Sequence, residues 1–166
     1  MNIPIKYLPK RLSLKDRKQQ ISQLKISRNA YLKNKYVARK KLHSYKSKKS
    51  QHLIKAQKIY NLNNIVINAN LSKKTGCSIN SLKKIVNKGQ GAYFSSGSRP
   101  NQSAQSWGLA RLASSISGGK AAAVDYQILE EGCSTNSKAL KLAKQAKKKH
   151  GFGTRRVAKV YLTRKH

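Results

Sequence analysis

The distribution of charge is the feature that most limits how this chain can fold. Its 166 residues include 37 Lys and Arg against four Asp and Glu, a formal net charge of +33. Residues 1–60 hold 18 of the basic residues and one acid, residues 138–166 hold 11 and no acid, and the middle holds 8 with three acids. Like charges at this density oppose compaction unless a polyanion neutralises them. The sequence therefore predicts two cationic arms around a more ordinary middle.

The first candidate for the neutralising partner is nucleic acid, because Lys and Arg displace condensed counterions from phosphates. An acidic protein lattice is the second candidate. No apolar run approaches the ~18 residues that a membrane helix needs. The segment from Met1 to Pro9 lacks the apolar core of a secretory signal. We therefore expect no membrane span and no secretory leader, and no small-molecule substrate.

The two cysteines, Cys77 and Cys133, stand 56 positions apart. The favoured interpretation is a pair of buried reduced thiols, and a disulfide or a metal site stays open as an alternative. There is no CxxC pair and no cluster of histidines, so a zinc site is unsupported. We expect no metal and no cofactor.

The basic N-terminal arm contains two predicted helices. Ser13 can cap a helix over about 14–32, in which apolar residues recur at helical spacing between Lys and Arg. Residues 33–49 are rich in Lys, Ser and Tyr without an apolar period, so we expect them to be extended or to become ordered only on a partner. Ser50 can cap a second, short helix that ends near Tyr60.

Residues 71–86 have the most regular pattern. A short helix with Leu71, a turn at Gly76 and a second helix capped by Ser78 match the spacing of a helix-turn-helix. The second helix would then expose Asn80, Lys83 and Lys84 to a DNA groove. An ordinary pair of antiparallel helices in a small helical domain is the alternative.

The rest of the middle and the C-terminal arm read as a loop followed by helices. We interpret residues 88–101 as a glycine-rich loop with neither dinucleotide nor Walker spacing. Helices are predicted over about 104–117, near 124–131 and after Ser137. The tail over 154–166 alternates in polarity, and we expect an extended strand that lies on a partner.

The acids of the middle do not form a convincing catalytic pair. Adjacent glutamates on a helix, as at Glu130 and Glu131, point in different directions. Internal salt bridges from this group of acids to Arg99 or Arg111 are the simpler interpretation. We therefore predict that the protein is not an enzyme; if it were one, Arg99, Asp125 and Glu130 would be the first residues to test.

Three motifs follow one another over roughly 70–135: K-T-G-C-S-I-N-S-L-K-K-I, K-G-Q-G-A-Y and S-R-P-N-Q-S-A-Q-S-W-G-L-A-R-L-A-S. This ordered set resembles an uncharacterised domain family of nucleocytoplasmic large DNA viruses, especially algal and mimivirus-like ones, and of tailed phages. The basic N-terminal arm also resembles that of the short viral members, and Asp125 falls where the family often has an aspartate. The family has no established activity, so the resemblance implies an origin in a large DNA virus and a component packed into the particle.

Together these observations predict a mainly α fold: a small helical domain over 66–135 with a helix-turn-helix-like hairpin and a Gly-rich loop, between basic arms over 1–65 and 136–166. The expected function is that of a minor capsid or internal protein of the virion, made in the host cell and located in the capsid interior or on the inner shell surface. Its expected partners are the major capsid protein or other capsid proteins, and double-stranded DNA. A DNA-binding regulator that uses the hairpin and a ribosomal-protein-like RNA binder remain alternatives. The candidate binding residues are Arg11, Lys15, Arg17, Lys18, Arg28, Arg39, Lys40, Lys41, Lys48, Lys49, Asn80, Lys83, Lys84, Arg99, Lys147, Lys148, Lys149, Arg155 and Arg156.

Overall fold

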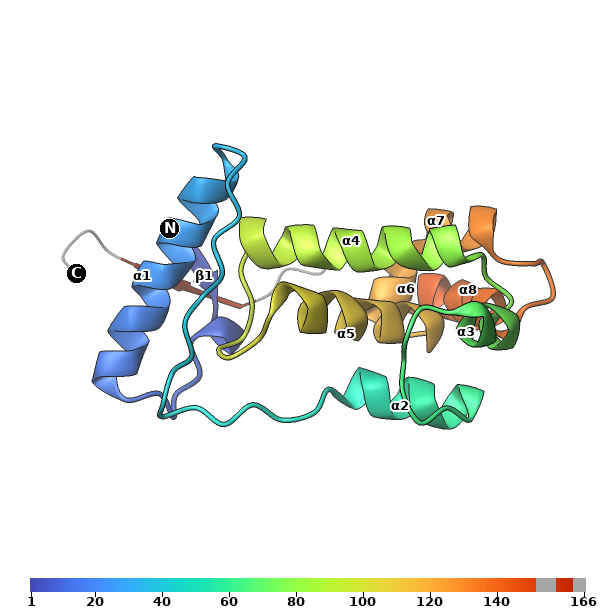
Figure 1. Cartoon of the computed structure of the whole chain (residues 1–166), viewed down its shortest axis with the longest axis horizontal. Coiled ribbons are helices and arrows are strands. Elements are labelled where there is room, and N and C mark those ends of the chain that lie inside the picture. The colour runs from blue at the N-terminus through green and yellow to red at the C-terminus, as the bar shows by residue number, and fades with distance from the viewer. Residues whose placement is uncertain (152–157, 163–166) are drawn as a thin grey trace. The chain divides into compact units, whose positions relative to one another are not determined.

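The computed structural model describes residues 1–151 and 158–162, and over these residues the chain is mainly helical, which confirms the predicted fold class (Figure 1). In chain order the elements are β1 (Asn2–Pro4), the 3-10 turn η1 (Ile5–Tyr7), α1 (Leu14–Tyr31), α2 (Gln51–Tyr60), α3 (Ala69–Thr75), α4 (Ile79–Ser95), α5 (Ala104–Ile116), α6 (Lys120–Val124), α7 (Tyr126–Gly132), α8 (Lys138–His150) and β2 (Lys159–Tyr161). None of the helices in the described part of the chain is long and apolar enough to cross a membrane.

Side-chain caps place several helix starts where the sequence predicts them. The Ser13 hydroxyl accepts a hydrogen bond from the Asp16 amide, and the Ser50 and Ser137 hydroxyls do the same for α2 and α8. Such bonds satisfy amides that have no partner inside the helix. The predicted helices after Ser13, Ser50 and Ser137 are thereby confirmed.

The described residues divide into two compact units. The first unit comprises residues 1–48 and 91–104 together with strand β2. The second unit comprises residues 49–90 and 105–151. Helix α4 contributes residues to both units, and each unit has buried residues of its own.

The second unit is built on a continuous apolar core from α2 to α8. Leu82, Ile85, Leu112, Ile116 and Leu129 are fully buried in it. In helix α8 the buried residues Ala139, Leu140, Ala143 and Ala146 recur at helical spacing, so this strongly basic helix still presents an apolar stripe to the core.

Helices α4 and α5 lie side by side and antiparallel (Figure 1). At their crossing Gly89 faces Gly108: a Cβ on Gly89 would lie 2.6 Å from the Gly108 Cα, and a Cβ on Gly108 would lie 2.8 Å from the Val86 carbonyl oxygen. The two backbones can approach this closely because neither glycine carries a side chain.

This crossing also explains why one prediction was wrong. Residues 88–95 belong to helix α4, whereas the glycine content suggested that the loop begins at residue 88. Gly89 serves close packing between helices rather than a turn, and only residues 96–103 form the connection to α5.

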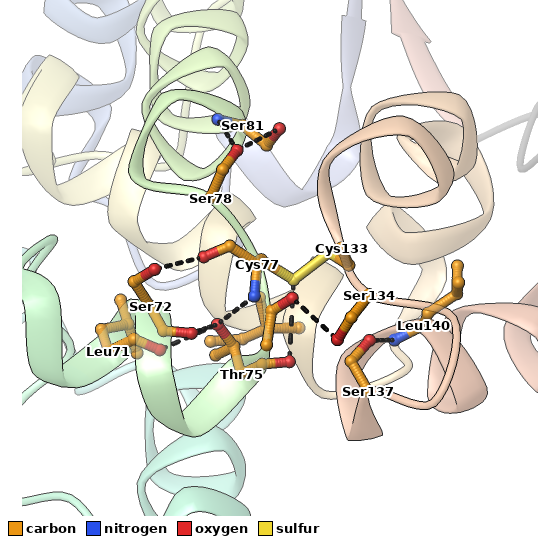
Figure 2. Close-up of a disulfide and its surroundings, with 12 residues drawn as sticks. Leu71, Ser72, Thr75, Cys77, Ser78, Ser81, Cys133, Ser134, Ser137 and Leu140 are labelled. Carbon is orange, nitrogen blue, oxygen red and sulfur yellow. Dashed lines mark hydrogen bonds between the residues drawn. A yellow bond between two sulfur atoms is a disulfide. The ribbon is translucent and has the colours of Figure 1, made fainter.

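A disulfide between Cys77 and Cys133 joins the α3–α4 turn to the α7–α8 turn (Figure 2). The two residues form an isolated antiparallel bridge, in which the Ser78 amide donates to the Gly132 carbonyl at 2.8 Å and the Ser134 amide donates to the Gly76 carbonyl at 2.8 Å. Both cysteines are buried, as predicted, but the favoured interpretation as reduced thiols was wrong. The two cysteines meet because two turns that are distant in the sequence fold against each other.

Hydroxyl groups support both sides of the disulfide. The Thr75 hydroxyl donates to the Leu71 carbonyl at 2.8 Å and accepts from the Cys77 amide at 3.3 Å (Figure 2). Gly76 adopts φ +74, a left-handed conformation that glycine tolerates. The predicted sequence of short helix, glycine turn and Ser78-capped helix is confirmed at the level of these elements, because the Ser81 amide donates to the Ser78 hydroxyl at 3.2 Å.

The first unit joins the two ends of the described chain. Strands β1 and β2 pair antiparallel, with Ile3 opposite Val160. The tail was expected to lie on a partner, but residues 159–161 pair with the same chain; residues 154–157 and 163–166 of that prediction lie outside the described residues. Buried Gln20 of α1 donates to the carbonyls of Tyr7 at 3.2 Å and Ser98 at 3.4 Å, which ties the helix to both segments.

The segment that follows α1 is extended and anchored at every third residue. Tyr36 contacts two aromatic rings, Arg39 is half-buried, and Leu42 and Tyr45 are buried. The Asn101 side chain accepts from the Leu42 amide at 2.7 Å and donates to the carbonyls of Leu42 and Tyr45. The prediction of an extended segment is confirmed, but its anchors belong to the same chain rather than to a partner.

Candidate nucleic-acid interface

Helix α1 exposes four cations outside the stripe that its buried residues form. Its buried residues Asp16, Gln20, Leu24 and Ser27 recur every three or four positions. Lys15, Lys18, Lys25 and Arg28 are exposed, and their side chains form no hydrogen bond or ion pair within the described part of the chain. We call these four residues the α1 face. Lys25 was missed by the sequence analysis, although the helical period of the buried residues would have revealed it.

Two more cations are held beside α1 by a side-chain clamp. The Gln23 amide group donates to the Lys40 carbonyl at 3.3 Å and accepts from the Lys40 amide. The clamp fixes the backbone of the extended segment to the helix, while the side chains of Lys40 and Lys41 remain exposed. The structure thus brings part of the predicted Arg39–Lys41 cluster close to the helix.

Arg39 contributes to the fold itself. Its guanidinium donates to the Ser27 hydroxyl at 3.1 Å, the Tyr93 carbonyl at 2.9 Å and the Ser98 hydroxyl at 2.8 Å, and it lies 3.7 Å from the Tyr93 ring centroid. Burial lowers the pKa of this guanidinium from its ordinary value, while the Tyr93 and Tyr7 side chains act in the opposite direction. The group nevertheless stays charged at neutral pH.

Other predicted cations have partial internal roles. The Arg11 guanidinium lies 4.7 Å from the Tyr45 ring centroid, the Arg17 guanidinium donates to the Leu8 carbonyl at 3.2 Å, and the Lys147 ammonium lies 4.2 Å from the Tyr126 ring centroid. Lys48, Lys49 and Arg99 are exposed. Arg155 and Arg156 lie outside the described residues.

The second unit has two cationic helix faces of its own. In α4 the exposed residues Asn80, Lys83 and Lys84 lie opposite buried Leu82 and Ile85. In α8 Lys148 and Lys149 are exposed, and Lys148 shares a face with the exposed Lys141 and Lys144, because positions 141, 144 and 148 follow the helical repeat. Lys141 and Lys144 were missed by the sequence analysis; the spacing of the alanines in α8 is the signal that predicts them.

Two of the four acids, Asp125 and Asp16, are buried inside the fold. Asp125 is 1% exposed, and it accepts from Arg111 Nε at 2.9 Å, Arg111 Nη2 at 2.7 Å, Lys88 Nζ at 2.8 Å and Ser115 Oγ at 3.0 Å. Burial by itself raises the pKa of Asp125, but the hydrogen bonds and charges of Arg111 and Lys88 outweigh it and hold the pKa below its ordinary value. The expected salt bridge to Arg111 is confirmed for this acid.

The other acids differ in their surroundings. Asp16 is 5% exposed and accepts from the amide and the hydroxyl of Ser44, each at 2.7 Å; these hydrogen bonds hold its pKa below its ordinary value. Glu130 and Glu131 are exposed and accept from the Tyr126 hydroxyl and the Gln127 amide, whereas the ion pairs found among the described residues involve only Asp125. All four acids of the sequence lie in the described residues, and among them Glu130 and Glu131 are the exposed ones.

The chain belongs to the family of unknown function DUF5824. The family matches residues 4–131, which is most of the chain. No curated protein and no solved structure matches this sequence. The matched range includes the α1 face, the clamped segment, Cys77 and the Asp125 cluster, whereas Cys133 and the cationic helix α8 follow it.

The resulting surface of the first unit is almost purely cationic. Residues 1–48 contain fifteen Lys and Arg, and Arg99 brings the count to sixteen over 1–48 and 91–104, against one acid, Asp16. Asp16 is buried and hydrogen-bonded to Ser44, so the one acid among these residues is not exposed beside their lysines. A phosphate backbone is the kind of ligand that such a surface attracts.

Proposed function

We propose that this protein is a structural component of a large DNA virus particle that binds genomic double-stranded DNA through its exposed cations. The observation that carries the binding part is the charge of residues 1–48 and 91–104 of the first unit, where sixteen basic residues accompany a single buried acid. The fold forms without using most of these cations. They are therefore available to neutralise phosphates, and the counterions that they release drive the association.

The chemistry of the exposed cations favours binding that depends little on DNA sequence. Most of them are lysines, which act as flexible point charges and not as the planar bidentate donors that distinguish bases. A protein of this kind condenses or lines DNA. Acidic capsid surfaces would bind the same lysines by the same electrostatics, so the particle offers two neighbouring partners.

The resemblance to domains of large DNA viruses supports the placement in a virus particle, on the capsid interior or the inner shell surface. The role proposed is binding and not catalysis. The most constrained carboxylate, Asp125, already accepts four hydrogen bonds and is shielded from solvent, so its environment supports a structural role.

The binding part is tested by titrating the protein into two fluorescent duplexes of unrelated sequence over a range of salt concentrations. We expect equal affinities for the two duplexes, and an affinity that falls steeply with salt, with a slope of about −0.9 per phosphate neutralised. Replacing Lys15, Lys18 and Lys25 together by Ala reduces the magnitude of this slope by about 2 to 3 if all three contact phosphates. Ser22→Ala on the same side of α1 is the matched control and leaves the slope unchanged.

Binding that is insensitive to salt, or absent at low salt, contradicts the proposal. The placement is tested separately by following the chain through shell and genome fractions of gently disrupted particles. Release by nuclease indicates DNA as the main partner, retention with the shell indicates the capsid, and absence from particles refutes the structural role.

The second candidate function is a DNA-binding regulator that uses α3 and α4. The observation that favours it is the exposure of Asn80, Lys83 and Lys84 on one side of the first turns of α4, after a tight turn at Gly76. A recognition helix reads bases with such residues. In that case Asn80→Ala and Lys83→Ala weaken binding to one preferred sequence more than to unrelated DNA. Equal losses on every duplex count against this function.

A further inference from the structure

We propose that Tyr36 is a stacking site for an unpaired base of a single-stranded nucleic acid. The inference rests on the proposed function, because it adds a base contact to a surface that attracts phosphates. It would give the first unit a preference for single strands that electrostatics alone does not supply.

The Tyr36 ring is exposed within an aromatic cluster. Tyr36 is 67% exposed, although its ring contacts Tyr31 at a centroid distance of 6.0 Å and Phe94 at 5.2 Å. The interplanar angles are 71° and 70°, so both contacts are edge-to-face rather than stacked. The ring is supported by its neighbours but remains largely open to solvent, as base stacking requires.

Backbone hydrogen bonds fix the chain just before Tyr36. Helix α1 ends in a Schellman turn: the Lys35 amide donates to the Ala30 carbonyl at 2.9 Å, and the Asn34 amide donates to the Tyr31 carbonyl at 3.0 Å. Asn34 has the left-handed φ of +55 that this turn needs. The chain therefore reverses just before Tyr36, and little backbone conformational entropy remains to be lost when a base stacks on its ring.

The cluster is itself anchored in the first unit. The Phe94 ring lies 5.0 Å from the buried Tyr93 ring, and the Phe94 carbonyl accepts from the Ser27 hydroxyl at 3.4 Å. Arg39 stacks on Tyr93 and donates to its carbonyl. The ring that supports Tyr36 is thus connected to buried residues, so Tyr36 is part of a built surface and not a side chain on a loose loop.

Three exposed cations lie near Tyr36 in the chain. Arg28 is in the last turn of α1, and Lys33 and Lys35 are in the reversal itself. All three are exposed, and their side chains form no hydrogen bond or ion pair in the described residues. Cations beside an open aromatic ring are the arrangement with which proteins bind single strands, the cations on phosphates and the ring on a base.

The test compares three fluorescent ligands at about 0.15 M salt: a thymidine oligonucleotide of about 16 nucleotides, an abasic strand of the same length and charge, and a duplex. The unaltered full chain should bind the thymidine strand more tightly than the abasic strand. Tyr36→Ala should weaken binding to the thymidine strand by about 5- to 150-fold, the range for loss of one stacked base. Its binding to the abasic strand and the duplex should change by less than about twofold, which also shows that the variant is folded.

Two matched variants separate stacking from general apolar contact. Tyr36→Phe retains the ring and should bind all three ligands like the unaltered chain. Leu32→Ala removes another exposed apolar side chain, 78% exposed in the same turn, and should also leave binding unchanged.

Equal affinity of the unaltered chain for the thymidine and abasic strands overturns the stacking site while leaving the proposed function intact. Equal losses of Tyr36→Ala on all three ligands also overturn it, because they indicate a change in fold or charge. Failure of the unaltered chain to bind any of the three ligands overturns the proposed DNA binding, and the stacking site with it.

Discussion

Replacing Asp125 by Ala should lower the free energy of unfolding more than most single changes in the second unit. The carboxylate accepts two hydrogen bonds from Arg111, one from Lys88 and one from Ser115, and its side chain is fully buried. Breaking a buried ion pair costs about 3–5 kcal/mol, because the remaining charge stays desolvated. Lys88 is 46% exposed and Arg111 is 21% exposed, so both can partly turn to water. We therefore expect the free energy of unfolding to fall by about 3 kcal/mol, near the lower limit of that range.

Urea unfolding followed by the fluorescence of Trp107 measures this loss, because Trp107 is the only tryptophan and lies in helix α5 of the second unit. For a slope of about 1.5 kcal/mol/M, a loss of 3 kcal/mol lowers the midpoint by about 2 M. Glu130→Ala is the matched control. It changes the net charge equally but removes an exposed carboxylate with one hydrogen bond to Tyr126, so we expect a change within about 0.5 kcal/mol.

The pH dependence gives an independent test of the same reasoning. Because the pKa of Asp125 is lowered in the folded protein, its contribution to the free energy of unfolding is fully present above the unfolded pKa of about 4. This contribution is lost as the pH falls through the lower pKa of the folded state. The difference in stability between the unaltered chain and Asp125→Asn should therefore shrink in acid. Equal losses for Asp125→Ala and Glu130→Ala at neutral pH would refute the assignment of Asp125 as a buried structural anchor.

Three further predictions test other parts of the fold. Replacing Cys77 and Cys133 together by Ser, or adding a reductant, should lower the free energy of unfolding by about 4 kcal/mol, as expected for a crosslink across 56 residues. A reductant should not change the stability of the double variant. An unchanged stability of the unaltered chain in reductant would contradict the prediction. Asn101→Gly keeps the φ of +58 but removes three hydrogen bonds, so trypsin should cut the extended segment at Lys40 and Lys41 about tenfold faster, whereas Ser96→Ala should not change the rate. Gly108→Ala should destabilise the α4–α5 crossing by about 1–3 kcal/mol in thermal unfolding followed by circular dichroism, while Gly91→Ala, whose new methyl group meets nothing nearer than 3.8 Å, should be neutral or stabilising; equal effects would count against the close crossing.

The sequence alone predicts the local parts of this structure well, because the signals for them are local. A capping side chain and the residues of the next few turns determine where a helix begins, and the starts after Ser13, Ser50 and Ser137 follow from them. Composition likewise predicts that cations cover the surface, since four acids cannot neutralise 37 basic residues. The extended character of residues 33–49 follows from the absence of an apolar period.

The partners of these elements are decided only by the tertiary structure. The local sequence does not predict that Cys77 bonds to Cys133, that Asp125 pairs with Lys88 and Arg111, or that Asn101 accepts a hydrogen bond from Leu42. Glycine illustrates the difference: Gly76 forms the turn that its conformational freedom suggests, whereas Gly89 lies inside helix α4, where its lack of a side chain lets the backbone of Gly108 come within contact distance. Which cations remain exposed, as on the α1 face, and which serve the fold, as Arg39 does, likewise depends on contacts between residues far apart in the chain. Such contacts depend on how whole helices and segments pack, and a short stretch of sequence does not determine that packing.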